Sequence, residues 1–313
     1  MGTSVDALRG KAVVVTGAGR GIGAAYARHA ASEGARVVVN DVDADVAEEV
    51  TAQIRSSGAT AIAHHGDVSV WTDAHDLIER CLDEFGAIDG LVNNAGIIRV
   101  RRAEELDEET FRRVVEVNLL GTAYCGTHAI KRMLQQGHGS IVNVTSGSQA
   151  GWKLLAAYSA SKGGVASLTY TWAIELADTG IRVNAVSPTA ATRMLDEFAA
   201  YLGPDRAPSP PRDESSAANN APVVTYLLSD AAQGINGQVV RIDRRALSLV
   251  THPSILLPVV ERGEWTFADV QAAFERQLRS KVLPLGMAQV SQSVSDGGAR
   301  LGLDPLRSGE DRR

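Results

Sequence analysis

Tyr158 and Lys162 have the residue types and the spacing of a proton-transfer pair. They are four residues apart within a helical pattern, so both side chains lie on one face of the helix. An ammonium group beside a phenol favours the phenolate by Coulomb attraction, which predicts a pKa for Tyr158 below the usual value of about 10. Ser146 lies twelve residues before Tyr158, at the end of a predicted strand, where its hydroxyl can hydrogen-bond a substrate oxygen. These three side chains are candidate catalytic residues.

Asn118 is the fourth candidate. It lies inside a long predicted helix, where asparagine is unfavourable because its side chain competes for backbone hydrogen bonds. A functional residue and a tolerated polar residue both explain this position, and the pattern leaves the two interpretations open.

A glycine-rich turn lies near the start of the chain. Residues 16–23 are Thr-Gly-Ala-Gly-Arg-Gly-Ile-Gly, directly after the first predicted strand and at the start of the first predicted helix. Small residues let the backbone approach a pyrophosphate, and the helix N-terminus offers unpaired N–H groups and the positive end of the helix dipole. Asp41 ends the second predicted strand, where its carboxylate can accept hydrogen bonds from an adenosine ribose. The pattern predicts a dinucleotide site.

Two residues of this region favour different cofactors. Arg20 lies where a basic side chain can bind the 2′-phosphate of NADP, whereas Asp41 would repel that phosphate. The repulsion between the Asp41 carboxylate and a phosphate shielded from water costs more free energy than one exposed arginine contributes by attraction. We therefore expect NAD to be the cofactor.

The elements that position these residues alternate between strand and helix. β-branched apolar runs predict buried strands at 12–15, 37–39, 59–63, 88–92, 141–144 and 181–185. Helical patterns separate them, at 21–32, 44–56, 72–85, 108–135 and 157–178. Such alternation implies parallel strands joined by right-handed crossovers. The sequence therefore predicts an α/β fold with a doubly wound parallel sheet of the Rossmann type.

The rest of the chain differs in composition, because all ten prolines lie from Pro188 onward. Residues 190–220 are polar and proline-rich, which predicts a surface loop that acts as a substrate lid or has no role. A helix at 218–229 and a strand at 238–242 are expected to complete the sheet.

A short helical extension is expected after the sheet. Thr266 and Asp269 form a capping box ahead of a periodic stretch at 267–282. The expected organisation is a dinucleotide-binding catalytic domain at 1–250, a C-terminal helical extension at 251–290 and a flexible tail at 291–313.

Composition narrows the class of protein. With 313 residues, 44% hydrophobic and 22% charged, the chain can bury a large core, which argues against disorder. A net charge of −6 argues against nucleic acid and anionic membranes as partners. Cys81 and Cys125 lack the spacing of a zinc site or a disulfide framework and fit a reducing compartment. Without an export signal or an apolar run long enough to span a bilayer, a soluble cytoplasmic protein without metal is expected.

Taken together, the motifs resemble the short-chain dehydrogenase/reductase family over about residues 5 to 245. The likeness is carried by Thr16–Gly23, Asp67-Val68, Asn93-Asn-Ala-Gly96, Asn118, Ser146, Tyr158-Ser-Ala-Ser-Lys162 and Arg182-Val-Asn-Ala-Val-Ser-Pro188. The resemblance implies that Tyr158 is the general acid/base and that Ser146 orients the reacting oxygen. It also implies that Lys162 holds the nicotinamide ribose and lowers the pKa of Tyr158, and that Asn118 anchors a proton-relay water. The residues that it implies for the cofactor are Gly17, Arg20, Gly21, Ile22, Gly23, Asp41, Asp67, Val68, Asn94, Ala95, Gly96, Tyr158, Lys162, Pro188 and Thr192.

Within that family the chain is most similar to the hydroxyacyl-CoA dehydrogenase part of multifunctional β-oxidation enzymes. This likeness rests on Val38-Val-Asn-Asp41, Ser187–Met194, Ala221–Leu228 and the segment around Trp265. It implies an NAD-dependent oxidoreductase that interconverts a secondary alcohol and a ketone. The alternatives are a reductase or dehydrogenase of a steroid, polyketide or sugar-type carbonyl, and a non-enzymatic nucleotide-binding scaffold.

Apolar side chains border the expected pocket and favour an apolar substrate such as a 3-hydroxyacyl thioester. They are Trp152, Leu154, Leu155, Met194, Leu195 and Phe198. Arg99, Arg101 and Arg102 follow the fourth strand, where they could hold the phosphates of a CoA carrier or form a solvated patch paired with acidic neighbours. Apolar faces on the helices at 108–135 and 157–178 predict a homodimer or homotetramer.

Overall fold

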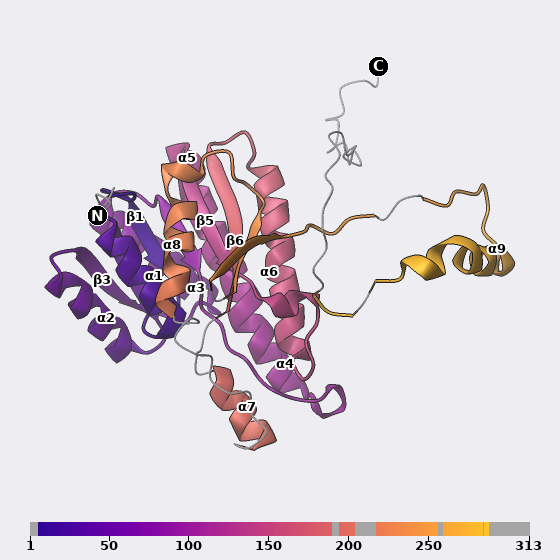
Figure 1. Cartoon of the computed structure of the whole chain (residues 1–313). Helices are drawn as coiled ribbons and strands as arrows, with labels where there is room; N and C mark the ends of the chain where they lie inside the picture. Colours follow the sequence, from indigo (N-terminus) through magenta and orange to yellow (C-terminus); the bar gives the residue numbers. More distant parts are fainter. Residues whose placement is uncertain are drawn as a thin grey trace.

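The computed structural model describes residues 6–189, 194–203, 217–243, 245–255, 259–283 and 285–287. Within these ranges, the strands form one sheet in the order β3-β2-β1-β4-β5-β6-β7-β8 (Figure 1). Neighbours from β3 to β7 are parallel, and β8 pairs antiparallel with β7 at the edge. The strands are β1 (Ala12–Val15), β2 (Arg36–Asp41), β3 (Thr60–His65), β4 (Gly90–Asn93), β5 (Gly139–Val144), β6 (Ile181–Thr189), β7 (Val239–Asp243) and β8 (Ala246–Val250).

Helices cover both faces of the sheet. Apolar residues of α1, α2 and α8 join one buried cluster with the strands, and those of α3, α5 and α6 join a second cluster on the opposite face. The helices are α1 (Gly21–Ser32), α2 (Ala44–Ser56), α3 (Trp71–Phe85), α4 (Glu108–Val115), α5 (Gly121–Gln136), α6 (Ala156–Glu175), α7 (Met194–Leu202), α8 (Ala217–Leu228) and α9 (Phe267–Ala273). The predicted α/β fold with a doubly wound parallel sheet is confirmed.

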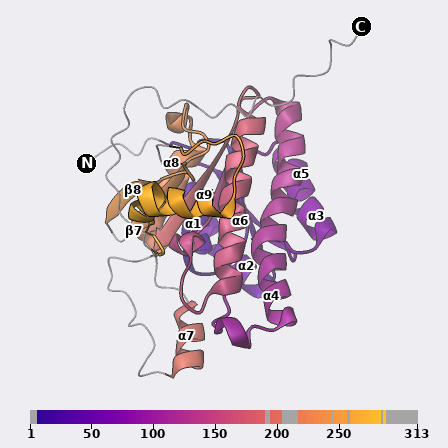
Figure 2. The ribbon, with the colours of Figure 1, turned by 90° about the vertical axis from the view of Figure 1, so that its right-hand side faces the viewer.

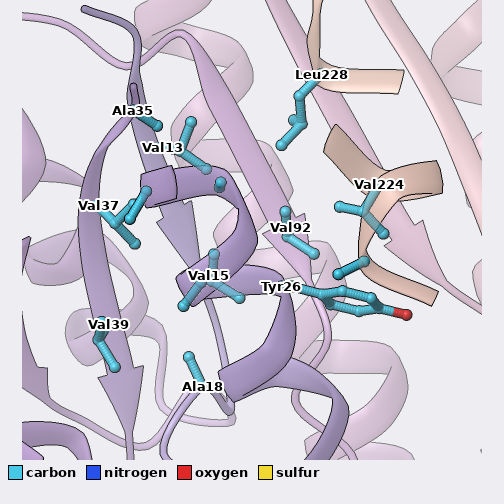
Figure 3. Close-up of a cluster of buried hydrophobic side chains, with 14 of the residues drawn as sticks. Val13, Val15, Ala18, Tyr26, Ala35, Val37, Val39, Val92, Val224 and Leu228 are labelled. Carbon is cyan, nitrogen blue, oxygen red and sulfur yellow. The ribbon is translucent and has the colours of Figure 1, made fainter. Parts of the chain in front are cut away.

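Figure 3 shows the cluster between the sheet and helices α1 and α8. Val13 and Val15 of β1 point into it, whereas Val14 belongs to the cluster on the other face, because successive side chains of a strand alternate. Tyr26 of α1 and Val224 of α8 complete the cluster, and both are buried. Burial on both faces explains the β-branched runs of the sequence and holds β1 firmly below the glycine-rich turn.

The strand order reverses between β1 and β4. The chain runs from β1 outward through β2 and β3, then crosses to β4 on the other side of β1. Connections that leave two neighbouring strands in opposite directions open a crevice at their carboxyl ends. The glycine-rich turn follows β1, and residues 94–96 follow β4. The two predicted cofactor motifs therefore flank this crevice.

The structure differs from the sequence prediction at three elements. The helix expected over 108–135 contains a π-helical turn at Glu116–Leu120. Residues 194–202, expected in a loop, form α7, since Met194 to Leu202 contain neither glycine nor proline. The strand β8 was not predicted, although its alternating Leu247 and Leu249 are typical of a strand.

The C-terminal part contains the expected capping box. The Thr266 hydroxyl accepts a hydrogen bond from the Asp269 N–H, and α9 begins at the next residue after Thr266. The helical stretch continues through a π-helical turn to Lys281. Residues 190–193 and 204–216 of the expected lid and the whole expected tail at 291–313 lie outside the described residues.

Candidate active site

Helix α6 carries Tyr158 and Lys162 on one face, as their spacing predicts. Both side chains are buried, and the Lys162 Nζ lies 5.7 Å from the centroid of the Tyr158 ring. Ser146 lies two residues after β5 ends at Val144, and its hydroxyl shares a hydrogen bond with that of Tyr158. The structure thus brings together the three side chains from two elements.

The acid–base properties of this group differ from the sequence prediction. Burial raises the pKa of Tyr158 to about 12, and the hydrogen bond with Ser146 only partly offsets that increase. The expectation that Lys162 lowers this pKa is wrong for the protein alone, since its Nζ donates to the Val144 carbonyl oxygen at 2.7 Å. Burial lowers the pKa of Lys162 itself to about 8. A protonated phenol and a weakly held ammonium proton therefore lie side by side.

Lys162 gives folding a pH dependence that a single substitution removes. Its pKa falls from 10.5 to about 8 on folding. Between these values the unfolded chain holds a proton that the folded chain has released, so stability rises with pH in this window. We expect the free energy of unfolding of the wild type relative to Lys162→Met to increase by about 1–2 kcal/mol between pH 8 and 10. Urea denaturation of both proteins measures this difference, and a difference that stays constant with pH would contradict it.

Asn118 lies in the π-helical turn and is fully buried. Its amide exchanges two hydrogen bonds with the backbone of Ile97, at 2.8 Å and 2.9 Å, and donates to the Ser161 hydroxyl at 3.1 Å. Ser161 in turn donates to the Tyr158 carbonyl oxygen. The π-helical turn, a feature often found at functional sites, thus ties the β4 loop to the helix of Tyr158. Its suggested role with a relay water stays a prediction.

The glycine-rich turn is packed against the β4 loop. Gly17 has a φ of 60°, and a Cβ there would lie 2.8 Å from the Ala95 Cα, so only glycine fits this approach. The Asn94 side chain donates to the carbonyl oxygens of Thr16 and Gly17. Thr16, which the prediction did not single out, accepts hydrogen bonds from the N–H groups of Asn94 and Ala95.

The start of α1 is open for an anion. Gly21 begins the helix, and a Cβ there would meet no atom within 4 Å. No described side chain caps this N-terminus, and its first turn holds no acidic residue. The N–H groups of Gly21, Ile22 and Gly23 are therefore free to bind a pyrophosphate. This feature fits a dinucleotide.

Asp41 and Arg20 are both engaged within the turn. Asp41 accepts hydrogen bonds from the N–H groups of Gly19 at 3.0 Å and Asp43 at 3.1 Å. The Arg20 guanidinium lies 2.5 Å from an Asp43 carboxylate oxygen, and this hydrogen bond lowers the pKa of Asp43. The pairing directs Arg20 toward Asp43 instead of leaving it for a ligand.

Asp67 and Val68 lie after β3, on the far side of the crevice. The Asp67 carboxylate accepts hydrogen bonds from Ser69 and from the Arg113 guanidinium at 2.9 Å. Burial raises the pKa of Asp67, but these hydrogen bonds outweigh it, so the net pKa is lowered. Val68 is buried against Gly121 at the start of α5. Nothing in the sequence pointed to Arg113, which is 46 residues from Asp67.

Three predicted cofactor positions remain. Gly96 faces the catalytic group, since a Cβ there would lie 3.3 Å from the Asn118 Oδ1 and 3.6 Å from the Lys162 Nζ. Its predicted role beside the nicotinamide ribose stays a prediction. Pro188 lies near the end of β6 and pairs with Ile242, whereas Thr192 lies outside the described residues.

An apolar cluster adjoins Tyr158. Its buried members are Ile98, Val100, Val114, Leu155, Ala157 and Tyr158, with Leu154, Phe198 and Tyr201 among those packed against it. Helix α7 thus contributes to the wall beside the candidate site. Trp152, in contrast, is 64% exposed, and the side chains of Met194 and Leu195 lie outside the description.

The three arginines after β4 have partners within the chain. The Arg99 guanidinium lies 2.8 Å from a Glu197 carboxylate oxygen of α7. Arg101 lies over the Tyr201 ring, and Arg102 lies 3.7 Å from a Glu104 carboxylate oxygen. The expected pairing of this patch with acidic neighbours is present, although Arg99 pairs with α7.

The described ranges contain neither a membrane-spanning helix nor a cluster of metal ligands. None of their helices combines the length and apolar character needed to cross a membrane. No group of three or more His, Cys, Asp or Glu side chains there is placed to hold a metal ion.

The fold and the site together define an oxidoreductase with a dinucleotide cofactor. A family model described as short chain dehydrogenase matches residues 11–200. The chain belongs to the short-chain dehydrogenase/reductase family, whose members use NAD or NADP.

Similar proteins act on different substrates. The chain is 40% identical over 242 residues to a cis-4-hydroxycyclohexanecarboxylate dehydrogenase of Sinomonas cyclohexanicum, which covers 76% of this chain and 97% of that protein. It is 33% identical to the versicolorin reductase stcU of Emericella nidulans, over 75% of this chain and 95% of that protein. A short chain dehydrogenase structure from Mycobacterium avium is similar with a TM-score of 0.78 and 31% identity, over 89% of this chain and 98% of that chain. These similarities show the family and leave the substrate open.

Proposed function

We propose that this protein is an NAD-dependent dehydrogenase that interconverts an apolar secondary alcohol and its ketone. The observation that carries the proposal is the buried Tyr158 hydroxyl, which shares a hydrogen bond with Ser146 beside Lys162 and the apolar cluster. A scaffold that only binds a nucleotide has no need for a buried phenol aligned with a serine hydroxyl.

Each polar residue has a distinct part in this proposal. Ser146 orients the reacting oxygen, and Tyr158 gives it a proton in reduction and takes one from it in oxidation. A phenol with a pKa of about 12 is protonated at neutral pH, which is the form that reduction requires. Lys162 stabilises the phenolate once its ammonium turns toward the ring. Asn118 holds the β4 loop against α6 through its hydrogen bonds to Ile97 and Ser161. A bound nicotinamide supplies or accepts the hydride.

The preference for NAD is supported by the glycine-rich turn. Asp41 presents a carboxylate at the end of β2, where the adenosine ribose of a dinucleotide lies in this fold. Arg20, the residue that favoured NADP, is paired with Asp43. The pyrophosphate would lie on the start of α1, and the nicotinamide ribose beside Gly96 and Lys162.

We propose a 3-hydroxyacyl thioester, or a similarly apolar alcohol, as the substrate. The apolar cluster beside Tyr158 supports an apolar substrate, and a relative 41% identical over 186 residues is a 3-oxoacyl-[acyl-carrier-protein] reductase of Synechocystis. That match covers 59% of this chain and 75% of that protein. A CoA carrier would have to displace the acidic partners of Arg99 and Arg102.

A second candidate is a cyclic alcohol that carries a carboxylate or a polyketide-type ketone. It is favoured by the relatives that act on a hydroxycyclohexanecarboxylate and on versicolorin. Either substrate uses the same proton path, so the two candidates differ only in what fills the pocket.

One assay separates these candidates. We expect turnover with NAD of a 3-hydroxyacyl thioester to exceed that of cyclic hydroxy acids and sugars, with NADP at least tenfold less effective. Comparing an acyl-CoA with its truncated thioester on the wild type and on the Arg99, Arg101 and Arg102→Ala variant then tests the carrier. Absence of turnover on the whole panel despite tight NADH binding would contradict the enzyme proposal.

We also propose that the chain forms a homodimer or homotetramer through the helices at 108–135 and 157–178. Ile174 of α6 is 72% exposed, and Phe111 of α4 and Leu134 of α5 are also exposed in the single chain. Exposed apolar side chains of this size on these three helices suit contact with another copy.

A further inference from the structure

The C-terminal arm, defined as the described residues between 251 and 287, extends away from the rest of the protein. Figure 1 shows α9 well separated from the sheet, and Figure 2 shows it projecting in front of α6. The arm is rich in exposed large apolar side chains, which are Ile255, Val259, Trp265, Phe267, Val270, Phe274, Val282, Leu283, Leu285 and Met287. A helix normally turns such residues toward a core.

The apolar residues of α9 form a stripe. Phe267, Val270 and Phe274 are separated by three and four residues, so they lie on one side of the helix. Phe267 is 85% exposed, and the other two are exposed as well. The capping box at Thr266 and Asp269 shows that the sequence specifies where this helix begins. The sequence therefore specifies helix α9, and no described residue of the same chain covers its apolar side.

Both ends of the arm are attached to the body. Strand β8 pairs with β7 before the arm begins, and the His252 ring lies 4.5 Å from the Tyr170 ring of α6. At the other end, a Cβ on Gly147 would lie 3.9 Å from the Met287 Cε, next to Ser146. An arm held at both ends presents α9 outward, so the described residues of the same chain do not cover the stripe.

We propose that the C-terminal arm docks on a second copy of this chain, with the stripe of Phe267, Val270 and Phe274 as its contact. This inference rests on the self-association proposed above and adds the element that makes the contact. In a twofold dimer both arms contribute, so each residue of the stripe occurs twice in the interface. Trp265, Phe267 and Phe274 are 46%, 85% and 46% exposed, so two arms bring six partly exposed aromatic side chains to the contact, the residue type that contributes most to interfaces.

The charge of the arm suits its own copy better than a membrane. Residues 259–283 contain four acidic and four basic side chains, so two arms do not repel each other. A helix that lies on anionic lipid carries an excess of Lys and Arg on its polar face, which this segment lacks. The second copy is therefore the occupant that fits both the apolar stripe and the neutral charge.

A photo-cross-linking experiment on the full chain tests the contact directly. A benzoylphenylalanine in place of Phe267 is expected to give a covalent dimer on a denaturing gel, joining a tagged to an untagged copy. The same residue in place of Arg276, on the opposite side of the helical stretch, is the matched control and is expected to give much less. Monomer bands alone from position 267 would overturn the proposal, because the arm would then contact its own chain or nothing.

Light scattering gives the second test and separates the arm from the helices at 108–135 and 157–178. We expect the Phe267→Asp/Phe274→Asp variant to have half the particle mass of the wild type, with an unchanged circular dichroism spectrum. Ala268→Asp adds a negative charge away from the stripe and is expected to keep the wild-type mass. A wild type of 33.1 kDa at micromolar concentration would overturn both self-association and the arm contact. An assembled double variant of wild-type mass would overturn the arm contact alone.

Discussion

Replacing Tyr158 with phenylalanine is expected to lower turnover by about 10²–10⁴-fold, the usual contribution of a general acid/base. The ring belongs to the apolar cluster with Leu155 and Val114, and phenylalanine keeps that packing. Only the hydroxyl is lost, together with its hydrogen bond to Ser146. The glycine-rich turn is untouched, so the dissociation constant of NADH should change less than threefold. The loss should therefore appear in kcat and not in cofactor binding.

Steady-state kinetics and NADH fluorescence titration measure the two effects. Tyr170→Phe is the matched control, because Tyr170 lies on the same helix and contacts His252. Near-native turnover of Tyr158→Phe would show that another group carries the proton.

The sheet could be predicted from the sequence because its signals are local. Buried parallel strands need β-branched runs such as Val37 to Val39, and helices α1 and α2 begin and end at the predicted residues. Helix α7 and strand β8 were missed for a physical reason. Both are short elements at the margin of the fold, and their neighbours in the sequence are polar or proline-rich, which weakens a periodic signal.

The members of the candidate site could be named from the sequence, but their interactions could not. Motif spacing places Tyr158 and Lys162 on one face, whereas the direction of the Lys162 ammonium toward the Val144 carbonyl depends on how β5 packs against α6. The pKa of Tyr158 likewise depends on burial, which outweighs any nearby charge here. Arg113 reaches Asp67 only through the fold. Long-range contacts of this kind leave no pattern in a single sequence.

Asp41 is expected to control the choice between NAD and NADP. We expect Asp41→Asn to shift the preference between the two cofactors by about 100-fold toward NADP, with NAD binding weakened. A like charge at about 4 Å costs about 4 kcal/mol at an effective dielectric constant of about 20, so removing the carboxylate removes most of the repulsion of a 2′-phosphate. Asparagine keeps one acceptor oxygen for the Gly19 N–H, whereas the hydrogen bond from the Asp43 N–H to the other oxygen is lost.

A second substitution shows whether Arg20 contributes. Asp43→Asn breaks the ion pair that holds Arg20, so the double variant should bind NADPH more tightly than Asp41→Asn alone. Asp43→Asn by itself should change little, because Asp41 still repels the phosphate. Dissociation constants of NADH and NADPH for the three variants and the wild type measure these effects. An unchanged ratio in Asp41→Asn would assign the choice of cofactor to a residue other than Asp41, whereas a gain confined to the double variant would assign it to the Arg20–Asp43 pair.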